Sequence, residues 1–515
     1  MKQGKPNPKY FVNTTHAQKP YTCRGAASMR SRVLPALLVG LGFILTGPVT
    51  AQTFKTLHAF KYSDGATPYS ELVLSGNTLY GTASAGGNSG SYNGNGALFA
   101  VNTDGSGFTN EYIFTAYPPG YYYTNTDGSV PFAGLILSGT NLYGAAYDGG
   151  AFGAGTVFAV NTNGSGFTNL YSFTGGNDGG GPDAALVLSS NILYGTTAYG
   201  GGANNGTVFA ININGTGFTN LFNFTNGISG DDPAGVLILS GRTLYGTTSG
   251  GNGGFGTVFA INTDGSSFTN LHVFSANSGF PLYTNSDGSN PNAGLVLAGK
   301  TLYGAAAQGG KFGSGTLFAV NTNGSGFTNL YTFTATSGSP LTNRDGANPR
   351  GSLIASGGTL YGTAYNGGRL GSGTLFAIST NGSGFTNLYT FTANSTAPYT
   401  NSDGSHPNAA LLLSGNTLYG TAYNGGNPSL NVEYGTVFSF TLASVSPPLL
   451  AINHSGTNVI LTWPTNTTGF TLESTTNLVP PVVWITNSPP PVVVNTNNTS
   501  TNGITGAQKF YRLSQ

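Results

Sequence analysis

One unit recurs along most of this sequence, and residues 352–391 show it clearly. The unit contains four short strand-forming segments, at 352–356, 359–364, 373–380 and 385–391. They are joined by Ser-Gly-Gly, by a longer Gly-rich loop and by Asn-Gly-Ser-Gly. Because these residues tolerate positive φ and close tight hairpins, the unit predicts a sheet of four antiparallel strands. No helical periodicity is present from residue 52 onward, so the chain is predicted to be all-β.

The repeat can be counted from its motifs. Leu-Tyr-Gly occurs seven times, with its tyrosine at Tyr80, Tyr143, Tyr194, Tyr245, Tyr303, Tyr361 and Tyr419. The Phe-Thr-Asn-Leu-Tyr-x-Phe strand follows only six of these copies, and its seventh copy, residues 54–60, precedes the first Leu-Tyr-Gly. Such an offset is expected when repeats close into a ring. The sequence therefore predicts a seven-bladed β-propeller over residues 52–442, with four strands per blade and the N-terminal strand closing the last blade.

The two ends of the chain differ from the repeat. Residues 1–51 contain a basic stretch from Met29, an apolar run at 33–45 and a small-residue cleavage signal before Gln52, which predicts a leader and signal peptide. We expect Met29 to be the true start and 1–28 to be a start-site artefact. After a linker at 443–448, residues 449–515 contain short alternating segments, which predict a small β-sandwich of immunoglobulin or fibronectin III character.

The composition excludes several functions. Charged residues make up only 6% of the chain, and after loss of residues 1–51 the net charge is 10 − 16 = −6. A net acidic chain without a Lys/Arg cluster is a poor nucleic-acid ligand. The single cysteine, Cys23, lies in the leader, so the mature chain has no disulfide or thiolate metal site. We expect an exported monomer without a transmembrane span, at the cell surface or outside the cell.

The repeated run Gly-x-Leu-x-Leu-Ser-Gly-x-x-Leu-Tyr-Gly, Gly-Gly, Gly-Thr-Val-Phe-Ala-x-Asn-Thr-Asp-Gly-Ser-Gly-Phe-Thr resembles the GloVer tandem repeat. That family is known from exported proteins of Verrucomicrobia and Gloeobacter, and the resemblance covers roughly residues 52–442. It implies an extracellular, propeller-like protein with no assigned activity. The C-terminal piece resembles the small β-domain appended to many secreted verrucomicrobial proteins.

An Asp-Gly-x-x-Pro motif supplies the first candidate site. It lies in the loop before each blade, with Ser229 in place of aspartate in the fourth loop. The aspartates are Asp64, Asp127, Asp178, Asp287, Asp345 and Asp403. A ring of carboxylates would attract Ca²⁺ or a cationic partner. The alternative is that each aspartate caps its own turn.

Aromatic residues near the Gly-Gly loops supply the second candidate, a platform for sugar rings. They are Tyr147, Tyr199, Tyr365 and Tyr423, with a further cluster at 121–123. The alternative is packing between blades. His58 and His272 replace a Tyr or Phe of the other copies and are interpreted as substitutions at a packing position. His406, Arg344 and Arg350 are the only irregular residues in the last two inter-blade loops.

No catalytic residue can be named, because the chain lacks Gly-x-Ser-x-Gly, a mature cysteine and an isolated pair of acids. No cofactor is predicted. The sequence favours a binding or surface-interaction module for polysaccharide or another cell-surface component. The alternatives are a secreted polysaccharide-active hydrolase or lyase on the same scaffold and a structural envelope protein. Unmatched carboxylates or a histidine in one blade would favour the enzyme, and uniform blades would favour binding.

Overall fold

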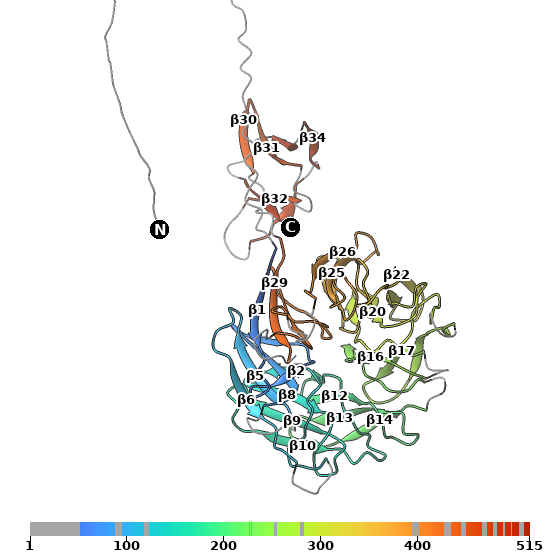
Figure 1. Cartoon of the computed structure of the whole chain (residues 1–515). Coiled ribbons are helices and arrows are strands. Elements are labelled where there is room, and N and C mark those ends of the chain that lie inside the picture. Colours follow the sequence, from blue (N-terminus) through green and yellow to red (C-terminus); the bar gives the residue numbers. More distant parts are fainter. Residues whose placement is uncertain are drawn as a thin grey trace, which may run out of the picture. The chain divides into compact units, whose positions relative to one another are not determined.

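A computed structural model describes most of the chain from residue 52 (Figure 1). The described residues are 52–87, 95–117, 123–225, 227, 229–251, 255–278, 283–393, 401–426, 434–443, 450–465, 471–476, 482–487, 490–495, 497–503 and 509–514. The predicted leader and nearly all of the predicted linker lie outside them.

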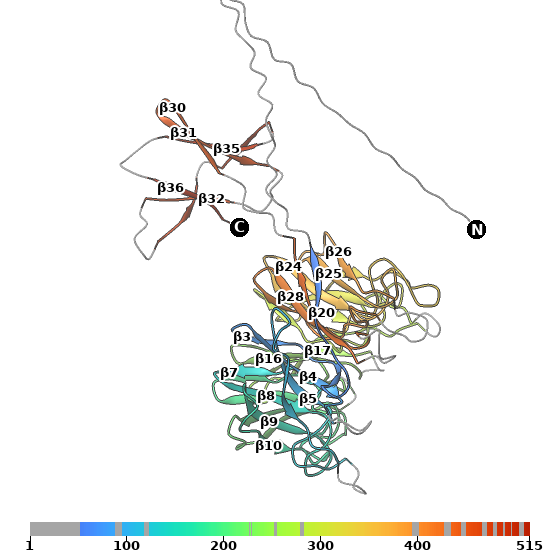
Figure 2. The ribbon, with the colours of Figure 1, turned by 60° about the vertical axis from the view of Figure 1, so that its left-hand side comes forward.

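The described residues form β-strands without a helix, as the sequence predicts. Up to residue 443 the strands make seven separate antiparallel sheets, which Figures 1 and 2 show from two sides. Six sheets have four strands, and the remaining one, the first along the chain, gains a short additional strand, β2 (Ala66–Pro68). Each sheet corresponds to one copy of the repeat.

The first strand of each sheet has three residues. These strands are β3 (Val73–Ser75), β7 (Ile136–Ser138), β11 (Val187–Ser189), β15 (Ile238–Ser240), β19 (Val296–Ala298), β23 (Ile354–Ser356) and β27 (Leu412–Ser414). The second strand carries the Leu-Tyr-Gly motif. These strands are β4 (Thr78–Ala85), β8 (Asn141–Ala146), β12 (Ile192–Thr197), β16 (Thr243–Thr248), β20 (Thr301–Ala306), β24 (Thr359–Ala364) and β28 (Thr417–Ala422).

The third strand is buried on both faces. These strands are β5 (Ala97–Asn102), β9 (Thr156–Asn161), β13 (Thr207–Asn212), β17 (Thr257–Asn262), β21 (Thr316–Asn321), β25 (Thr374–Ser379) and β29 (Thr436–Thr441). The fourth strand completes each sheet. These strands are β6 (Thr109–Ile113), β10 (Thr168–Ser172), β14 (Thr219–Asn223), β18 (Thr269–Val273), β22 (Thr328–Thr332), β26 (Thr386–Thr390) and, for the seventh sheet, β1 (Thr53–Ala59).

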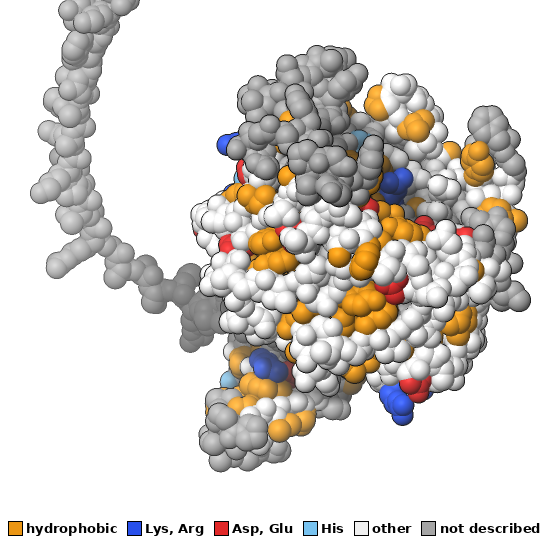
Figure 3. All heavy atoms as spheres, turned by 90° about the horizontal axis from the view of Figure 1, so that it is seen from below, with side chains coloured by type: hydrophobic (Ala, Val, Ile, Leu, Met, Phe, Trp, Pro, Cys, Tyr) orange, Lys and Arg blue, Asp and Glu red, His pale blue; other side chains and the backbone are white. Residues whose placement is uncertain are grey.

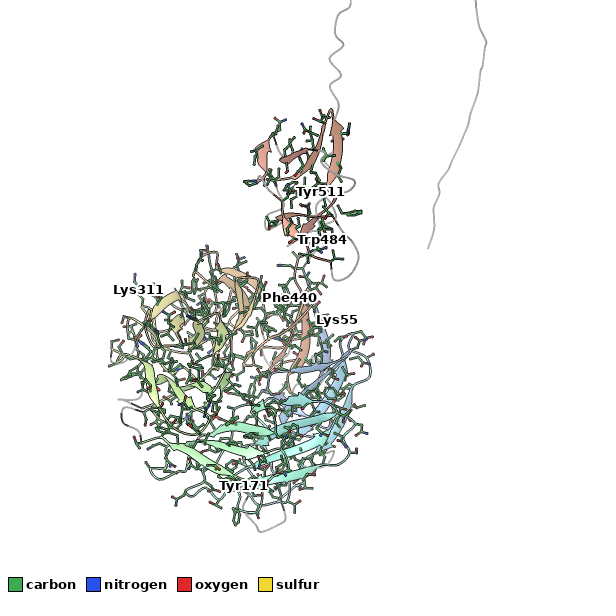
Figure 4. The ribbon with its side chains drawn as sticks, turned by 180° about the vertical axis from the view of Figure 1, so that it is seen from behind. Lys55, Tyr171, Lys311, Phe440, Trp484 and Tyr511 are labelled. Atoms are coloured by element: carbon green, nitrogen blue, oxygen red, sulfur yellow. The ribbon has the colours of Figure 1, made fainter. Side chains whose placement is uncertain are left out.

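The seventh sheet combines the first described strand with the last three of the repeat region. β1 pairs antiparallel with β29, from Thr53 opposite Thr441 to Ala59 opposite Thr436. Lys55 on β1 and Phe440 on β29, both labelled in Figure 4, belong to these two paired strands. This is the strand that the offset of the repeat assigns to the last unit.

The glycine of Leu-Tyr-Gly is explained by close packing inside the sheet. In the sixth sheet, a Cβ added to Gly362 would lie 2.6 Å from Cζ of Phe376 and 2.7 Å from Cδ2 of Leu353. The buried phenylalanine of the third strand therefore occupies the space above this glycine. Cores packed to this density do not accept an extra methyl group without shifting their neighbours.

Consecutive sheets are joined by a stacked pair of rings, with centroids 3.5–4.2 Å apart. The first ring of each pair lies on the fourth strand of one sheet. The second ring lies just before the fourth strand of the following sheet, except for Phe54, which lies within its strand, β1. The pairs are Tyr112–Phe167, Tyr171–Phe218, Phe222–Phe268, His272–Phe327, Tyr331–Phe385, Tyr389–Phe54 and His58–Phe108. The two histidines thus take the packing position of a tyrosine or phenylalanine.

The C-terminal residues form two further antiparallel sheets. One contains β30 (Ala451–Ser455), β31 (Asn458–Pro464), β35 (Asn497–Gly503) and β34 (Val492–Val494). The other contains β33 (Ile485–Thr486), β32 (Thr471–Thr475) and β36 (Phe510–Ser514). A small core of Leu461, Trp463 and Leu472 draws on both sheets.

Candidate functional site

The predicted carboxylate positions hold the loops between sheets in place. In the loop after the fifth sheet, Asp345 accepts hydrogen bonds from the Tyr331 hydroxyl at 2.8 Å and from the Thr334 N–H at 2.9 Å. The Thr334 hydroxyl donates to its second oxygen. Equivalent bonds surround Asp127, Asp178 and Asp403. Both carboxylate oxygens are therefore engaged inside the loop, which agrees with the turn-capping alternative.

Two of these aspartates face a histidine instead of a tyrosine. Asp287 lies 3.0 Å from Nε2 of His272, and Asp64 lies 3.3 Å from Nε2 of His58. Burial acts to raise the pKa of both carboxyls, but the histidine and the backbone N–H groups outweigh it and leave each pKa below its usual value. Conversely, burial and the neighbouring Asp178 raise the pKa of the Tyr171 hydroxyl to about 12.

All seven loops between the sheets contribute to one cavity of about 430 Å³, which we call the shared cavity. Most of its wall is built by the residues that directly follow the proline of the Asp-Gly-x-x-Pro motif. The first residue after each proline is Tyr69, Phe132, Asp183, Ala234, Asn292, Arg350 and Asn408. The next two positions are mostly small, so this first residue gives each loop its chemical character.

Aromatic rings form part of the cavity wall. The Tyr69 ring lies 5.1 Å from the Phe132 ring and 5.8 Å from the Tyr423 ring, measured between centroids. Phe132 in turn lies 5.6 Å from Tyr147. These four side chains line the cavity, and each is only partly buried. The Tyr199 ring lies 6.2 Å from the Tyr147 ring, measured between centroids, and Tyr199 is not among the lining residues.

Two carboxyl groups in the cavity have no counterpart in the other repeats. Burial raises the pKa of Glu71, and burial together with the nearby charge of Asp232 raises the pKa of Asp183 well above its usual range. Oδ1 of Asp183 is buried without a hydrogen-bond partner. Gly134 leaves room for Glu71, because a Cβ there would lie 2.6 Å from Cγ of Glu71.

A basic group lines the same cavity. The guanidinium carbon of Arg350 lies 4.2 Å from the centre of the Tyr365 ring, a cation–π contact. The Tyr365 ring also lies 4.8 Å from that of His406. Burial, followed by the charge of Arg350, lowers the pKa of His406. Two of the irregular residues in the sequence thus meet at Tyr365, whereas Arg344 is exposed elsewhere on its loop.

The remaining candidates fall outside the cavity. The six aspartates of the motif are not among the lining residues. Tyr121 and Tyr122 lie outside the described residues, and Tyr123 is 59% exposed. Among the residues that the structure covers, no group of three or more His, Cys, Asp or Glu side chains is placed to hold a metal ion. Figure 3 shows one face of the molecule, on which charged side chains are sparse.

Sequence reasoning missed Tyr69, Glu71, Phe132 and Asp183. The signal that identifies the first, third and fourth is present in the sequence: in loops that otherwise repeat, the residue after the proline changes from copy to copy. Sequence reasoning singled out the tyrosines near the Gly-Gly loops and at 121–123 instead. The cavity is lined by the part of each loop that keeps its length.

The fold and the cavity define an all-β repeat protein with a propeller-like succession of four-stranded sheets and a pocket of ligand size. Residues 115–284 and 282–402 match the Gloeobacter/Verrucomicrobia repeat, which together covers more than half of the chain. The chain belongs to this family, and the predicted resemblance is confirmed. No curated protein matches the sequence. No helix in the described ranges is long and apolar enough to cross a membrane.

Several solved structures resemble the fold at low identity. Oligogalacturonate lyase from Vibrio parahaemolyticus is 10% identical with a TM-score of 0.43, over 77% of this chain and 98% of that one. A puromycin-hydrolyzing peptidase of Mycobacterium tuberculosis is 12% identical with a TM-score of 0.43, over 77% and 57%. TolB from Acinetobacter baumannii is 11% identical with a TM-score of 0.32, over 72% and 78%. Identities and TM-scores this low give no basis for assigning the activity of any of these proteins to this chain.

Proposed function

We propose that the seven sheets close into a seven-bladed β-propeller, followed by a small β-sandwich. Contacts between the seventh and first sheets support closure. The Thr421 hydroxyl donates to the Ser70 carbonyl at 3.2 Å, as that of Thr82 does to Ala133 between the first and second sheets at 3.1 Å. The Thr67 N–H donates to the Tyr434 carbonyl at 2.8 Å. Between the first and second sheets, the Val130 N–H donates to the Asn95 carbonyl at the equivalent position.

We further propose that the protein is exported and binds carbohydrate in the shared cavity. The observation that carries this proposal is the pairing of an aromatic wall with unsatisfied polar atoms. The rings of Tyr69, Tyr147 and Tyr423 provide apolar faces, while Oδ1 of Asn292 and of Asn408 are buried without a hydrogen-bond partner. A sugar ring offers an apolar face and several hydroxyls, so it satisfies both kinds of group at once. Export is supported by the leader sequence.

In this proposal the four predicted tyrosines have two roles. Tyr147 and Tyr423 contact the ligand, because they line the cavity. Tyr199 and Tyr365 support the wall from outside through their ring contacts with Tyr147 and with Arg350. The six aspartates of the repeated motif fix the loops that carry these residues.

A glycan array of the purified protein, with and without Ca²⁺, tests this function. We expect binding that is weakened by Tyr147→Ala and by Tyr423→Ala. Tyr123→Ala is the matched control, since that tyrosine is exposed and does not line the cavity. An array without any signal would remove the proposal, and so would equal loss in all three variants.

A polysaccharide hydrolase or lyase is the second candidate, and the observation in its favour is the pair of unmatched carboxyls. Glu71 and Asp183 have a raised pKa and line a cavity, which is the environment of many general acids and bases. Prolonged incubation with each bound glycan, followed by mass analysis of the products, separates the two functions. Shortened chains that disappear in Glu71→Gln or Asp183→Asn would establish the enzyme.

A further inference from the structure

Among the described residues, Arg350 is the only basic side chain that lines the shared cavity, and the corresponding residues of the other loops are Tyr, Phe, Asp, Ala and Asn. We propose that the ligand of this cavity is an acidic carbohydrate, whose carboxylate or sulfate group is bound by the Arg350 guanidinium. This inference rests on the proposed carbohydrate-binding function and names the class of sugar.

The guanidinium is held in place but not neutralised. It lies over the Tyr365 ring at 4.2 Å, a contact that orients the group without using its N–H donors. In the part of the chain that the structure describes, the ion pairs do not include Arg350, and its recorded side-chain contact is the one with the Tyr365 ring. The side chain is partly buried, so its charge is partly desolvated.

The charge of Arg350 affects the pKa of two tyrosine hydroxyls near it. Burial raises the pKa of Tyr69 and of Tyr365, and the charge of Arg350 opposes that rise at both hydroxyls. Asp183 acts on Tyr69 in the opposite sense. Burial also raises the pKa of Asp183 and of Glu71, the two carboxyls that line the same cavity.

Geometry favours an anionic sugar over a simple anion. A planar guanidinium presents paired N–H donors that match a carboxylate or a sulfate. The aromatic wall from Tyr69 to Tyr147 continues around the same cavity, and its volume of about 430 Å³ exceeds what a small inorganic ion fills. An acidic sugar engages both features, whereas inorganic sulfate engages only Arg350.

The test compares three oligosaccharide sets on the purified protein by titration calorimetry: uronate-containing, sulfated and neutral chains of equal length. Arg350→Gln removes the charge and keeps a polar side chain. Arg344→Gln is the matched control, because that arginine lies six residues earlier on the same loop and is exposed. A hydrogen-bonded charge contact predicts a loss of about 10- to 100-fold in affinity for the acidic set in Arg350→Gln. Arg344→Gln should bind unchanged.

The outcomes separate this inference from the function beneath it. Preference for uronate or for sulfated chains, lost in Arg350→Gln, supports the inference and identifies the anionic group. Neutral chains that bind as tightly as acidic ones, with Arg350→Gln unaffected, overturn the inference and leave carbohydrate binding intact. Absence of binding in all three sets overturns both. If inorganic sulfate binds as tightly as the sulfated sugars, the claim that the ligand is a sugar is overturned. Thermal unfolding of each variant identifies any loss that follows from misfolding.

Discussion

Removal of residues 52–60 should destabilise the repeat region far more than the loss of nine residues from the edge of a fold ordinarily does. The deleted segment contains β1, which supplies the outer strand of the seventh sheet. It also contains Leu57 and Phe60, which are 7% and 0% exposed and belong to a core that includes Tyr419 of the seventh sheet and Phe99 of the first.

The magnitude follows from the buried side chains. Truncating a buried leucine costs about 2–5 kcal/mol and a buried phenylalanine about 3–5 kcal/mol. Loss of both therefore removes about 5–10 kcal/mol, which is comparable with the whole stability of a typical domain. The single change Phe60→Ala should cost about 3–5 kcal/mol. Phe173 has the same place in the second sheet and the same exposure of 0%, so Phe173→Ala should cost as much.

Urea unfolding followed by far-ultraviolet circular dichroism measures these costs. Tryptophan fluorescence is unsuitable, because Trp463 and Trp484 both lie in the C-terminal part of the chain. If the truncated protein unfolded at the same urea concentration as the intact one, closure through β1 would be wrong. A negligible cost for Phe60→Ala beside a full cost for Phe173→Ala would also contradict closure.

Three further predictions concern packing, pH and binding. Gly362→Ala should destabilise the protein by about 1–3 kcal/mol in urea unfolding, because the new methyl group would meet Phe376 Cζ at 2.6 Å, and an unchanged midpoint would refute the packing argument. The Asp287 pKa is lowered in the folded state, so its stabilisation is complete above the ordinary aspartate pKa of about 3.9 and is lost as the pH falls through the folded value. His272→Tyr should make unfolding in this acid range less steep in pH, and an identical pH profile would contradict the role of the histidine. Tyr147→Ala should weaken glycan binding about tenfold or more, the effect of ~1.4 kcal/mol, in titration calorimetry, whereas unchanged affinity would place the ligand elsewhere.

The sequence alone determined the local structure. It placed the four strands of residues 352–391 close to β23, β24, β25 and β26, and it assigned residues 54–60 to the last unit. Strand and turn are set by neighbouring residues, chiefly the alternation of apolar side chains and the Gly- and Asn-rich turns. Seven copies of the same signal make such a prediction more secure than a single copy would.

The sequence located the repeated aspartates but did not decide what they do. The sequence left a ligand-binding ring and a turn cap as alternatives for Asp345 and its equivalents, and their spacing did not identify the hydrogen-bond partner. The Tyr331 hydroxyl reaches Asp345 from 14 residues away, and only the folded loop brings the two groups together. These carboxylates therefore have their oxygens engaged within the protein. Acceptors without a hydrogen-bond partner are found instead in the shared cavity, at Oδ1 of Asn292 and of Asn408.

The sequence marks a variable position after each proline, but only the tertiary structure brings these positions together in the shared cavity. Tyr69, Asp183, Arg350 and Asn408 are scattered over more than 300 residues and have no common motif beyond the proline that precedes each one. They meet because seven similar sheets direct the same loop position to one place. A repeat fixes the position of such residues while leaving their identity free to vary. The sequence could thus specify the scaffold, but the chemistry of the site appeared only when the seven variable positions were brought together.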